Sequence, residues 1–385
     1  MKAFYCDIMD KKLKILLIMV LLFVFSYFSY IRFFKEDQVI KIGFVGSLTG
    51  KASELGVATR KGTFIAVNKI NESGGIKGKK IELVIKDDKT SRENAKEAIR
   101  EFNEEDINIV IGFSISGMYE AVLYADKKDM FMISPTMTTI KLSQRDDNFT
   151  RVLPENSKQS DYFAKLIEDK NSKKIGVIYD DDNREYATPI VQRFKNNLKN
   201  LNINISYERR FTKFDMNAEL FAKDIKRLGL DSIYMVCNST DAAKIIQQIE
   251  KLEYNLDKYA SSWAFNEELI SYGGKTVEGV YGASEYNYLN KNKKYLDFIN
   301  EYKNYYNEDA TFGAVFGYES MMILKQAIEN ADSTMSKDIK NSMLNIKEFD
   351  GVQSDIIYDE YLDASRETFI YRIENSEFKR VYIDL

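Results

Sequence analysis

Two adjacent acids, Asp87 and Asp88, are the residues of this sequence whose types most directly suggest chemistry. They end an apolar, alternating stretch at 80–88 that predicts a β-strand. Paired carboxylates at the end of a strand could bind a divalent metal or act in acid–base catalysis. The alternative is a solvated strand end or a cap on the following helix. No complementary acid cluster with ligand spacing is visible, so this alternative is favoured and no metal site is predicted.

Glycines beside the same strand raise the question of phosphate binding. A phosphate loop needs a glycine, four residues, then Gly-Lys and Ser or Thr. Only three residues separate Gly74 from Gly78, and Lys79 is followed by Lys80. The cluster follows a predicted helix and precedes a strand, where a helix C-cap and a turn are expected. The stretch GSLTG at 46–50 lacks the third glycine of the dinucleotide fingerprint. No nucleotide and no other cofactor is therefore predicted.

Composition excludes several further kinds of site. The chain has no histidine, which rules out Ser-His-Asp and Cys-His catalysis and histidine-ligated zinc. Its two cysteines, Cys6 and Cys237, cannot form a disulfide framework, and Cys237 ends an apolar run that predicts a buried strand. The net charge is 55 − 59 = −4, with basic residues spread along the chain, so no nucleic-acid partner is expected. An enzyme is not predicted.

The N-terminus carries an uncharged run of 17 residues, 15–31, behind four lysines. That length is at the short end of what spans a bilayer. A cleaved signal peptide and a retained anchor both fit, but no small-x-small cleavage site follows the run. The retained anchor is favoured, with 1–14 as a cytoplasmic tail and 15–34 as a transmembrane anchor or uncleaved signal. The rest of the chain is predicted to be extracytoplasmic and tethered to the membrane.

Behind this segment, strands alternate with helices in two successive runs. The first covers about 39–135 and the second about 160–263, and a connection near 150–160 joins them. Short apolar strands alternating with amphipathic helices predict an α/β fold with doubly wound parallel sheets in two similar lobes. Residues 283–385 change character, with helices and then strands, and are expected to complete the two lobes.

The stretch IKIGFVGSLTGKASELG…RKGTFIAVNKINESGGIKGKKIELVIKDDKTS (40–91) resembles the N-terminal lobe of the leucine/isoleucine/valine-binding protein family. These are the type I periplasmic solute-binding proteins of ABC transporters. The shared order is a strand, S-L-T-G, a helix ending in I-N-x-x-G-G-I-x-G-K, a strand and D-D. Further matches follow at VIGFSISG (110–117), MISPTMTT (132–139), RVLPENSKQSDYFAKLI (151–167) and KKIGVIYDDDNREYA (173–187).

The resemblance implies two α/β lobes joined by a three-stranded hinge, with a ligand cleft between them that closes by hinge motion. The crossovers are placed near 156–159, 283–287 and 348–352. The predicted first lobe is 39–157 plus 285–349. The predicted second lobe is 158–284 plus 350–385.

The resemblance also implies which first-lobe residues bind the ligand. In the family a loop serine and the S-P-x-x-T segment hold the ligand's carboxylate and amino group through hydroxyl and backbone groups. The matching residues are Ser116, Thr136 and Thr138. The alternative for Ser116 is a plain helix N-cap, and for Thr138 a surface hydroxyl.

From the second lobe, Tyr186 matches a position that closes over the ligand. Asn238 and Ser239 follow one predicted strand, and Ser262 and Trp263 follow the next. The alternative for Trp263, the single tryptophan, is an ordinary core or lid aromatic. Members that bind branched-chain amino acids carry an acid near position 262, where this sequence has serine. Two other acids, Asp241 and Glu285, could supply that charge instead.

These expectations favour an anchored receptor for an amino acid or related small polar ligand, delivering it to an ABC permease. The alternative is a ligand-sensing subunit that signals to a membrane partner. No cytoplasmic output domain is visible, because only about a dozen residues precede the apolar run.

Overall fold

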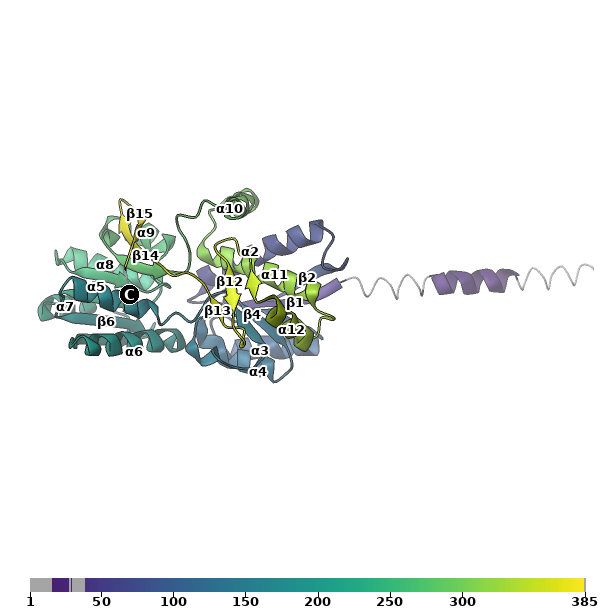
Figure 1. Cartoon of the computed structure of the whole chain (residues 1–385), viewed down its shortest axis with the longest axis horizontal. Helices are drawn as coiled ribbons and strands as arrows, with labels where there is room; N and C mark the ends of the chain where they lie inside the picture. Colours follow the sequence, from purple (N-terminus) through teal and green to yellow (C-terminus); the bar gives the residue numbers. More distant parts are fainter. Residues whose placement is uncertain (1–15, 28, 30–38, 384–385) are drawn as a thin grey trace, which may run out of the picture.

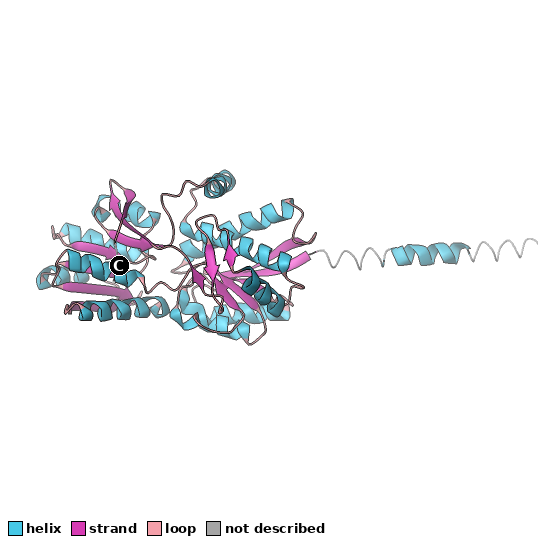
Figure 2. Cartoon of the chain, viewed as in Figure 1, coloured by secondary structure: helices cyan, strands magenta, loops and turns pink. Residues whose placement is uncertain are grey.

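The structure is a computed structural model that describes residues 16–27, 29 and 39–383. It contains two α/β lobes side by side, with helices on both faces of each sheet (Figures 1 and 2). The predicted fold class, two lobes built on parallel sheets, is confirmed.

The first lobe is built on a fully parallel sheet with strand order β2-β1-β3-β4-β5. Its strands are β1 (Val39–Gly46), β2 (Lys80–Asp87), β3 (Ile109–Ile111), β4 (Phe131–Ser134) and β5 (Phe149–Arg151). Its helices are α2 (Ser53–Glu72), α3 (Arg92–Glu104), α4 (Tyr119–Asp126), α10 (Lys293–Tyr306), α11 (Phe312–Asn330) and α12 (Ser336–Ile346), with the 3-10 turns η1 (Ser116–Met118) and η2 (Ile140–Leu142).

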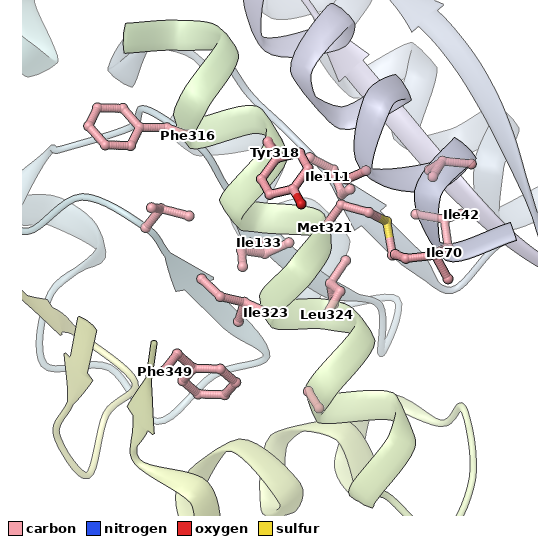
Figure 3. Close-up of a cluster of buried hydrophobic side chains, with 14 of the residues drawn as sticks. Ile42, Ile70, Ile111, Ile133, Phe316, Tyr318, Met321, Ile323, Leu324 and Phe349 are labelled. Carbon is pink, nitrogen blue, oxygen red and sulfur yellow. The ribbon is translucent and has the colours of Figure 1, made fainter. Parts of the chain in front are cut away.

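Both faces of the central strands β3 and β4 are buried, which explains their continuous apolar sequences, whereas the edge strand β2 alternates and is partly exposed. Ile109 and Ile111 of β3 face one core, and Val110 between them faces the other. The first of these cores lies beneath α11, whose Met321 and Leu324 pack over the sheet (Figure 3). Successive strand residues point to opposite faces, so each strand supplies both cores.

The second lobe holds a mixed sheet with strand order β15-β14-β10-β9-β8-β6-β7. The five strands from β10 to β7 are parallel, whereas β14 and β15 are antiparallel at one edge. The strands are β6 (Ile175–Asp180), β7 (Ile205–Phe211), β8 (Ser232–Val236), β9 (Asp257–Ala260), β10 (Tyr281–Ser284), β14 (Phe369–Glu374) and β15 (Glu377–Val381). The helices are α5 (Gln159–Asp169), α6 (Arg184–Asn200), α7 (Ala218–Leu228), α8 (Ser239–Lys251) and α9 (Glu267–Gly273), and the turn η3 covers Gly274–Val277. Cys237 is fully buried directly after β8, as predicted.

Three short antiparallel strands show that the third crossover lies later in the chain than predicted. They are β11 (Glu348–Phe349), β12 (Ile356–Tyr358) and β13 (Ala364–Ser365). The prediction assigned residues 350–385 to the second lobe, but residues up to Ala364 belong to the core of the first lobe. Two hydrogen bonds fix them there: Tyr358 donates to the Arg151 carbonyl at 3.1 Å, and Thr150 donates to the Leu362 carbonyl at 2.9 Å. The chain reaches the second sheet only with β14.

Residues 16–27 are helical, and their apolar side chains are exposed. Within the described residues, no helix is both long and apolar enough to cross a membrane. Part of the predicted anchor at 15–34, and the whole of the predicted tail at 1–14, lie outside the described residues.

Candidate functional site

The carboxyl ends of the parallel strands of both sheets meet at the cleft between the lobes, where open α/β sheets bind ligands. An inner cavity of about 40 Å³ lies there, lined by residues of both lobes. An outer cavity of about 440 Å³ adjoins it, and the two share Leu55, Trp263 and Phe312. Six of the eight predicted site residues line the inner cavity: Ser116, Thr136, Thr138, Tyr186, Ser262 and Trp263.

The first-lobe hydroxyls differ in how many hydrogen bonds they already make. Thr136 donates to the backbone carbonyl of Ser114 at 2.8 Å, so its hydroxyl proton is committed to the protein. The hydroxyl oxygen of Ser116 accepts from the Thr138 backbone N–H at 3.2 Å, and its own proton has no acceptor within the described chain. Thr138 is buried, and its hydroxyl oxygen has no partner among the described residues. An unpaired buried hydroxyl is costly, so Thr138 is the group most ready to bond to a ligand.

The second-lobe residues form a tight cluster behind the cavity. The Tyr186 hydroxyl lies 3.1 Å from the Ser262 hydroxyl and accepts from the Trp263 backbone N–H at 3.0 Å. The rings of Tyr186 and Trp263 meet edge to face, 5.4 Å apart. Asn156 donates to the Ser262 hydroxyl at 3.2 Å. Burial raises the pKa of Tyr186, so its phenol is neutral. Ser262 is held by the protein itself and carries no charge for a ligand.

Asn238 and Ser239 do not join the inner cavity. Asn238 caps α8 by accepting from the Asp241 backbone N–H at 2.9 Å, and Ser239 donates to Glu268 at 3.3 Å. Both line the outer cavity. The outer cavity is strongly charged, with Lys51, Glu54, Lys213, Asp241, Lys244 and Glu268 in its lining.

Several residues of the inner cavity have no signal in the sequence. Phe312 and Phe316 reach it from α11, and Leu55 reaches it from α2. Their spacing is that of core residues, so periodicity does not distinguish them. Asn183 also lines the cavity, and its side-chain oxygen accepts from the Gly117 backbone N–H at 2.9 Å across the cleft. An asparagine before a helix is typical of an ordinary N-cap, so the sequence alone does not indicate this hydrogen bond across the cleft.

Charged side chains also join the lobes. The Lys51 ammonium of the first lobe lies 2.8 Å from Asp180, 3.1 Å from Asp182 and 3.8 Å from Asp241 of the second. Burial raises the pKa of Asp180, whereas the Lys51 charge opposes that rise. Elsewhere along the cleft, Lys141 lies 2.6 Å from Glu185. These ion pairs join the two lobes across the cleft.

Asp87 and Asp88, the adjacent acids that could have formed a metal site, instead connect two loops by hydrogen bonds. Asp87 accepts from the Thr49 hydroxyl at 2.7 Å, and Asp88 accepts from the Ser47 hydroxyl at the same distance. Within the described part of the chain, no group of three or more acids or cysteines is placed to hold a metal ion. The next helix has its own cap, since Ser91 accepts from the Asn94 backbone N–H.

Residues 39–377 match the family described as periplasmic binding protein. The chain belongs to this family. The predicted resemblance is thereby confirmed, and membership makes the chain a binding protein rather than an enzyme. It also implies that the two lobes act outside the cytoplasm.

Individual periplasmic binding proteins are similar over most of their length. The Leu/Ile/Val-binding protein homolog 3 of Brucella melitensis is 25% identical over 338 residues, which cover 86% of this chain and 90% of that protein. Among solved structures, the branched-chain amino acid transporter substrate-binding protein LivJ of Streptococcus pneumoniae, in complex with isoleucine, has a TM-score of 0.80 at 25% identity and covers 89% of this chain and 99% of its own. A solute-binding protein of an ABC transporter from R. palustris, in complex with benzoate, has the same TM-score at 16% identity, with 89% and 95% covered, and shows the fold alone.

Proposed function

We propose that this periplasmic binding protein is an extracytoplasmic receptor that binds a small polar ligand, an amino acid or related compound, and delivers it to an ABC permease. The observation that carries the proposal is that, among the residues the structure describes, the Thr138 hydroxyl at the inner cavity has no partner and the neighbouring Ser116 hydroxyl proton has no acceptor. Both can bond to a carboxylate without breaking a bond in the protein. The isoleucine bound to the Streptococcus pneumoniae relative gives the class of ligand to test first.

The size of the inner cavity supports binding by hinge motion. A cavity of about 40 Å³ has room for only a few water molecules. A ligand therefore enters when the lobes separate, and the cross-cleft contacts of Lys51 and Asn183 form as they close. In this proposal the lobes are 39–157 and 285–364 on one side, and 158–284 and 369–383 on the other. The N-terminal segment at 15–34 tethers the receptor to the membrane.

A ligand screen tests the function. The purified chain is heated with amino acids, small amides, urea and short carboxylates, each in excess. A ligand at 100 times its dissociation constant stabilises the folded protein by about 2.7 kcal/mol, which raises the melting temperature visibly. Ser116→Ala should reduce the shift given by any compound that binds. If no compound in the panel shifts the melting temperature, the proposal of a small polar ligand is wrong.

A further inference from the structure

Among the described residues that line the inner cavity, one has a charged side chain, Glu285. The other lining groups are hydroxyls, amides, aromatic rings and aliphatic chains. Glu285 directly follows β10 at the second crossover, and it is only 5% exposed. A buried carboxylate is costly unless a cation or several hydrogen-bond donors compensate its charge.

The protein provides little of that compensation. Among the described residues, the Glu285 carboxyl has one hydrogen-bond partner on another residue, the Thr368 hydroxyl at 3.5 Å. No lysine or arginine of the described chain forms an ion pair with it. The guanidinium of Arg366 favours its charged form, but Arg366 is already paired with Glu319 at 2.6 and 3.2 Å. The negative charge is therefore available to a ligand.

The cavity thus offers two complementary kinds of partner. Glu285 presents an anion, and Thr138 and Ser116 present hydroxyl groups on the first lobe. A molecule that satisfies both carries a cationic amine and a hydrogen-bond acceptor such as a carboxylate. Ser262 bears no charge, and its hydroxyl is already bonded to Asn156 and Tyr186, so it cannot take the role of Glu285.

We propose that Glu285 is the specificity-determining residue of this site, and that it receives a protonated amine, so that the cavity takes zwitterionic or cationic amines and rejects acids that lack one. This inference rests on the proposed function. It excludes purely anionic ligands such as the benzoate bound to the R. palustris relative, because their charge would meet the Glu285 carboxylate.

The charge state of Glu285 agrees with this assignment. Burial raises its pKa to about 7, with the nearby Glu155 acting in the same direction. Arg366 and the Thr368 hydroxyl act in the opposite direction, and Tyr162 is the other titratable group that senses its charge. An ammonium beside the carboxyl favours its charged form and displaces the proton. With this pKa the Glu285 carboxyl is only partly charged at pH 7 in the ligand-free protein and mostly charged at pH 8, and a bound ammonium shifts it further to the charged form.

The test uses probes that differ only in the ammonium group: L-leucine with 4-methylpentanoate, and L-alanine with propionate. The full chain, Glu285→Gln and Glu155→Gln are titrated at pH 8, with Trp263 fluorescence and calorimetry as readouts. Wild type should bind the amino acid of a pair roughly 10- to 100-fold more tightly than the matching acid, as expected for a hydrogen bond to a charged group. Glu285→Gln should bring the two affinities to within a few-fold of each other.

Glu155→Gln is the matched control, because Glu155 lies beside the same hinge but outside the inner cavity. It should keep the amino-acid preference. Melting curves of all three proteins verify that each is folded. The inference is overturned, with the proposed function intact, if wild type binds the amine-free acids equally well or if Glu285→Gln keeps the preference. Absence of binding by every probe would instead overturn the proposal of an amino-acid ligand itself.

Discussion

The Lys51 ammonium lies 2.8 Å from the Asp180 carboxylate, and the two residues belong to different lobes. Asp180 is fully buried, and Lys51 also reaches Asp182 and Asp241. Opening the cleft separates Lys51 from all three acids and returns the Asp180 carboxylate to water. This group of charges therefore favours the closed arrangement of the lobes rather than the folding of either one.

Lys51→Met should consequently open the cleft without unfolding the protein. We expect ligand affinity to fall about 5- to 30-fold, since a partly buried ion pair contributes on the order of 1–2 kcal/mol. The radius of gyration of the ligand-free protein should rise in small-angle X-ray scattering. Lys61→Met is the matched control, because Lys61 is similarly exposed but pairs with Glu308 inside the first lobe. An equal loss of affinity in both variants would contradict a role in closure.

Thr138→Val tests the unpartnered hydroxyl. The substitution keeps the side-chain shape and removes an oxygen that makes no bond within the described protein. Stability should be unchanged or slightly higher, whereas affinity for the best ligand of the screen should fall roughly tenfold. Titration of Trp263 fluorescence gives the affinity, and urea unfolding gives the stability.

Thr136→Val provides the contrast. The Thr136 hydroxyl bonds to the Ser114 carbonyl, so its loss should destabilise the protein by about 1 kcal/mol. Similar stability losses in Thr136→Val and Thr138→Val would show that the Thr138 hydroxyl has a partner in the protein after all.

Glu267 should make the protein less stable as pH rises from about 4.3 to about 7. Burial raises its pKa to about 7, and one of its carboxyl oxygens is buried without a partner in the described chain. Between the unfolded-state pKa of about 4.3 and pH 7, the folded state holds a proton that the unfolded state releases. The free energy of unfolding therefore falls as pH rises across this range, and the loss is complete above pH 7.

Glu267→Gln should remove this contribution. At pH 8 the variant should be more stable than wild type by on the order of 2 kcal/mol, and at pH 5 the difference should be much smaller. Urea unfolding at both pH values measures this. Glu285, whose pKa is also raised by burial to about 7, is present in both proteins and cancels, whereas the charge of the adjacent Glu268 adds to the shift of Glu267 and is part of the measured difference. The exposed Glu72→Gln serves as control, and a pH-independent difference would argue against titration of Glu267.

The contact between α2 and α11 depends on glycine. A methyl group at Gly62 would lie 1.7 Å from the Ala314 carbonyl oxygen, which is backbone and cannot rotate away. Gly62→Ala should therefore separate the helices and destabilise the protein by about 3 kcal/mol or more, despite the higher helix propensity of alanine. Urea unfolding compares it with Glu72→Ala on the exposed face of α2. Unchanged stability would mean that the two helices can shift apart without loss.

Sequence patterns predict the strands and the lobes well, because strands buried on both faces read as continuous apolar runs. The carboxyl ends of the parallel strands meet at the cleft, so the loops that follow these strands bring Ser116, Thr138 and Trp263 there. The patterns fail where the partner is distant in sequence. The apolar strands at 356–358 and 364–365 fit either lobe equally, and only their bonds to Arg151 and Thr150 assign them to the first. Phe312 and Phe316 look like core residues, and it is tertiary packing that brings them to the cavity.

The interleaving of the two lobes along the chain affects the order in which they can be completed during synthesis. The Thr63 hydroxyl of α2 bonds to the Gly317 carbonyl of α11, 254 residues later. The strands of the first sheet thus leave the ribosome long before the helix that covers them. The apolar face of this sheet stays uncovered until α11 has been synthesised. The second sheet is also completed only by the last strands, β14 and β15. Contacts this far apart slow folding, so neither lobe can be completed until nearly the whole chain has been synthesised.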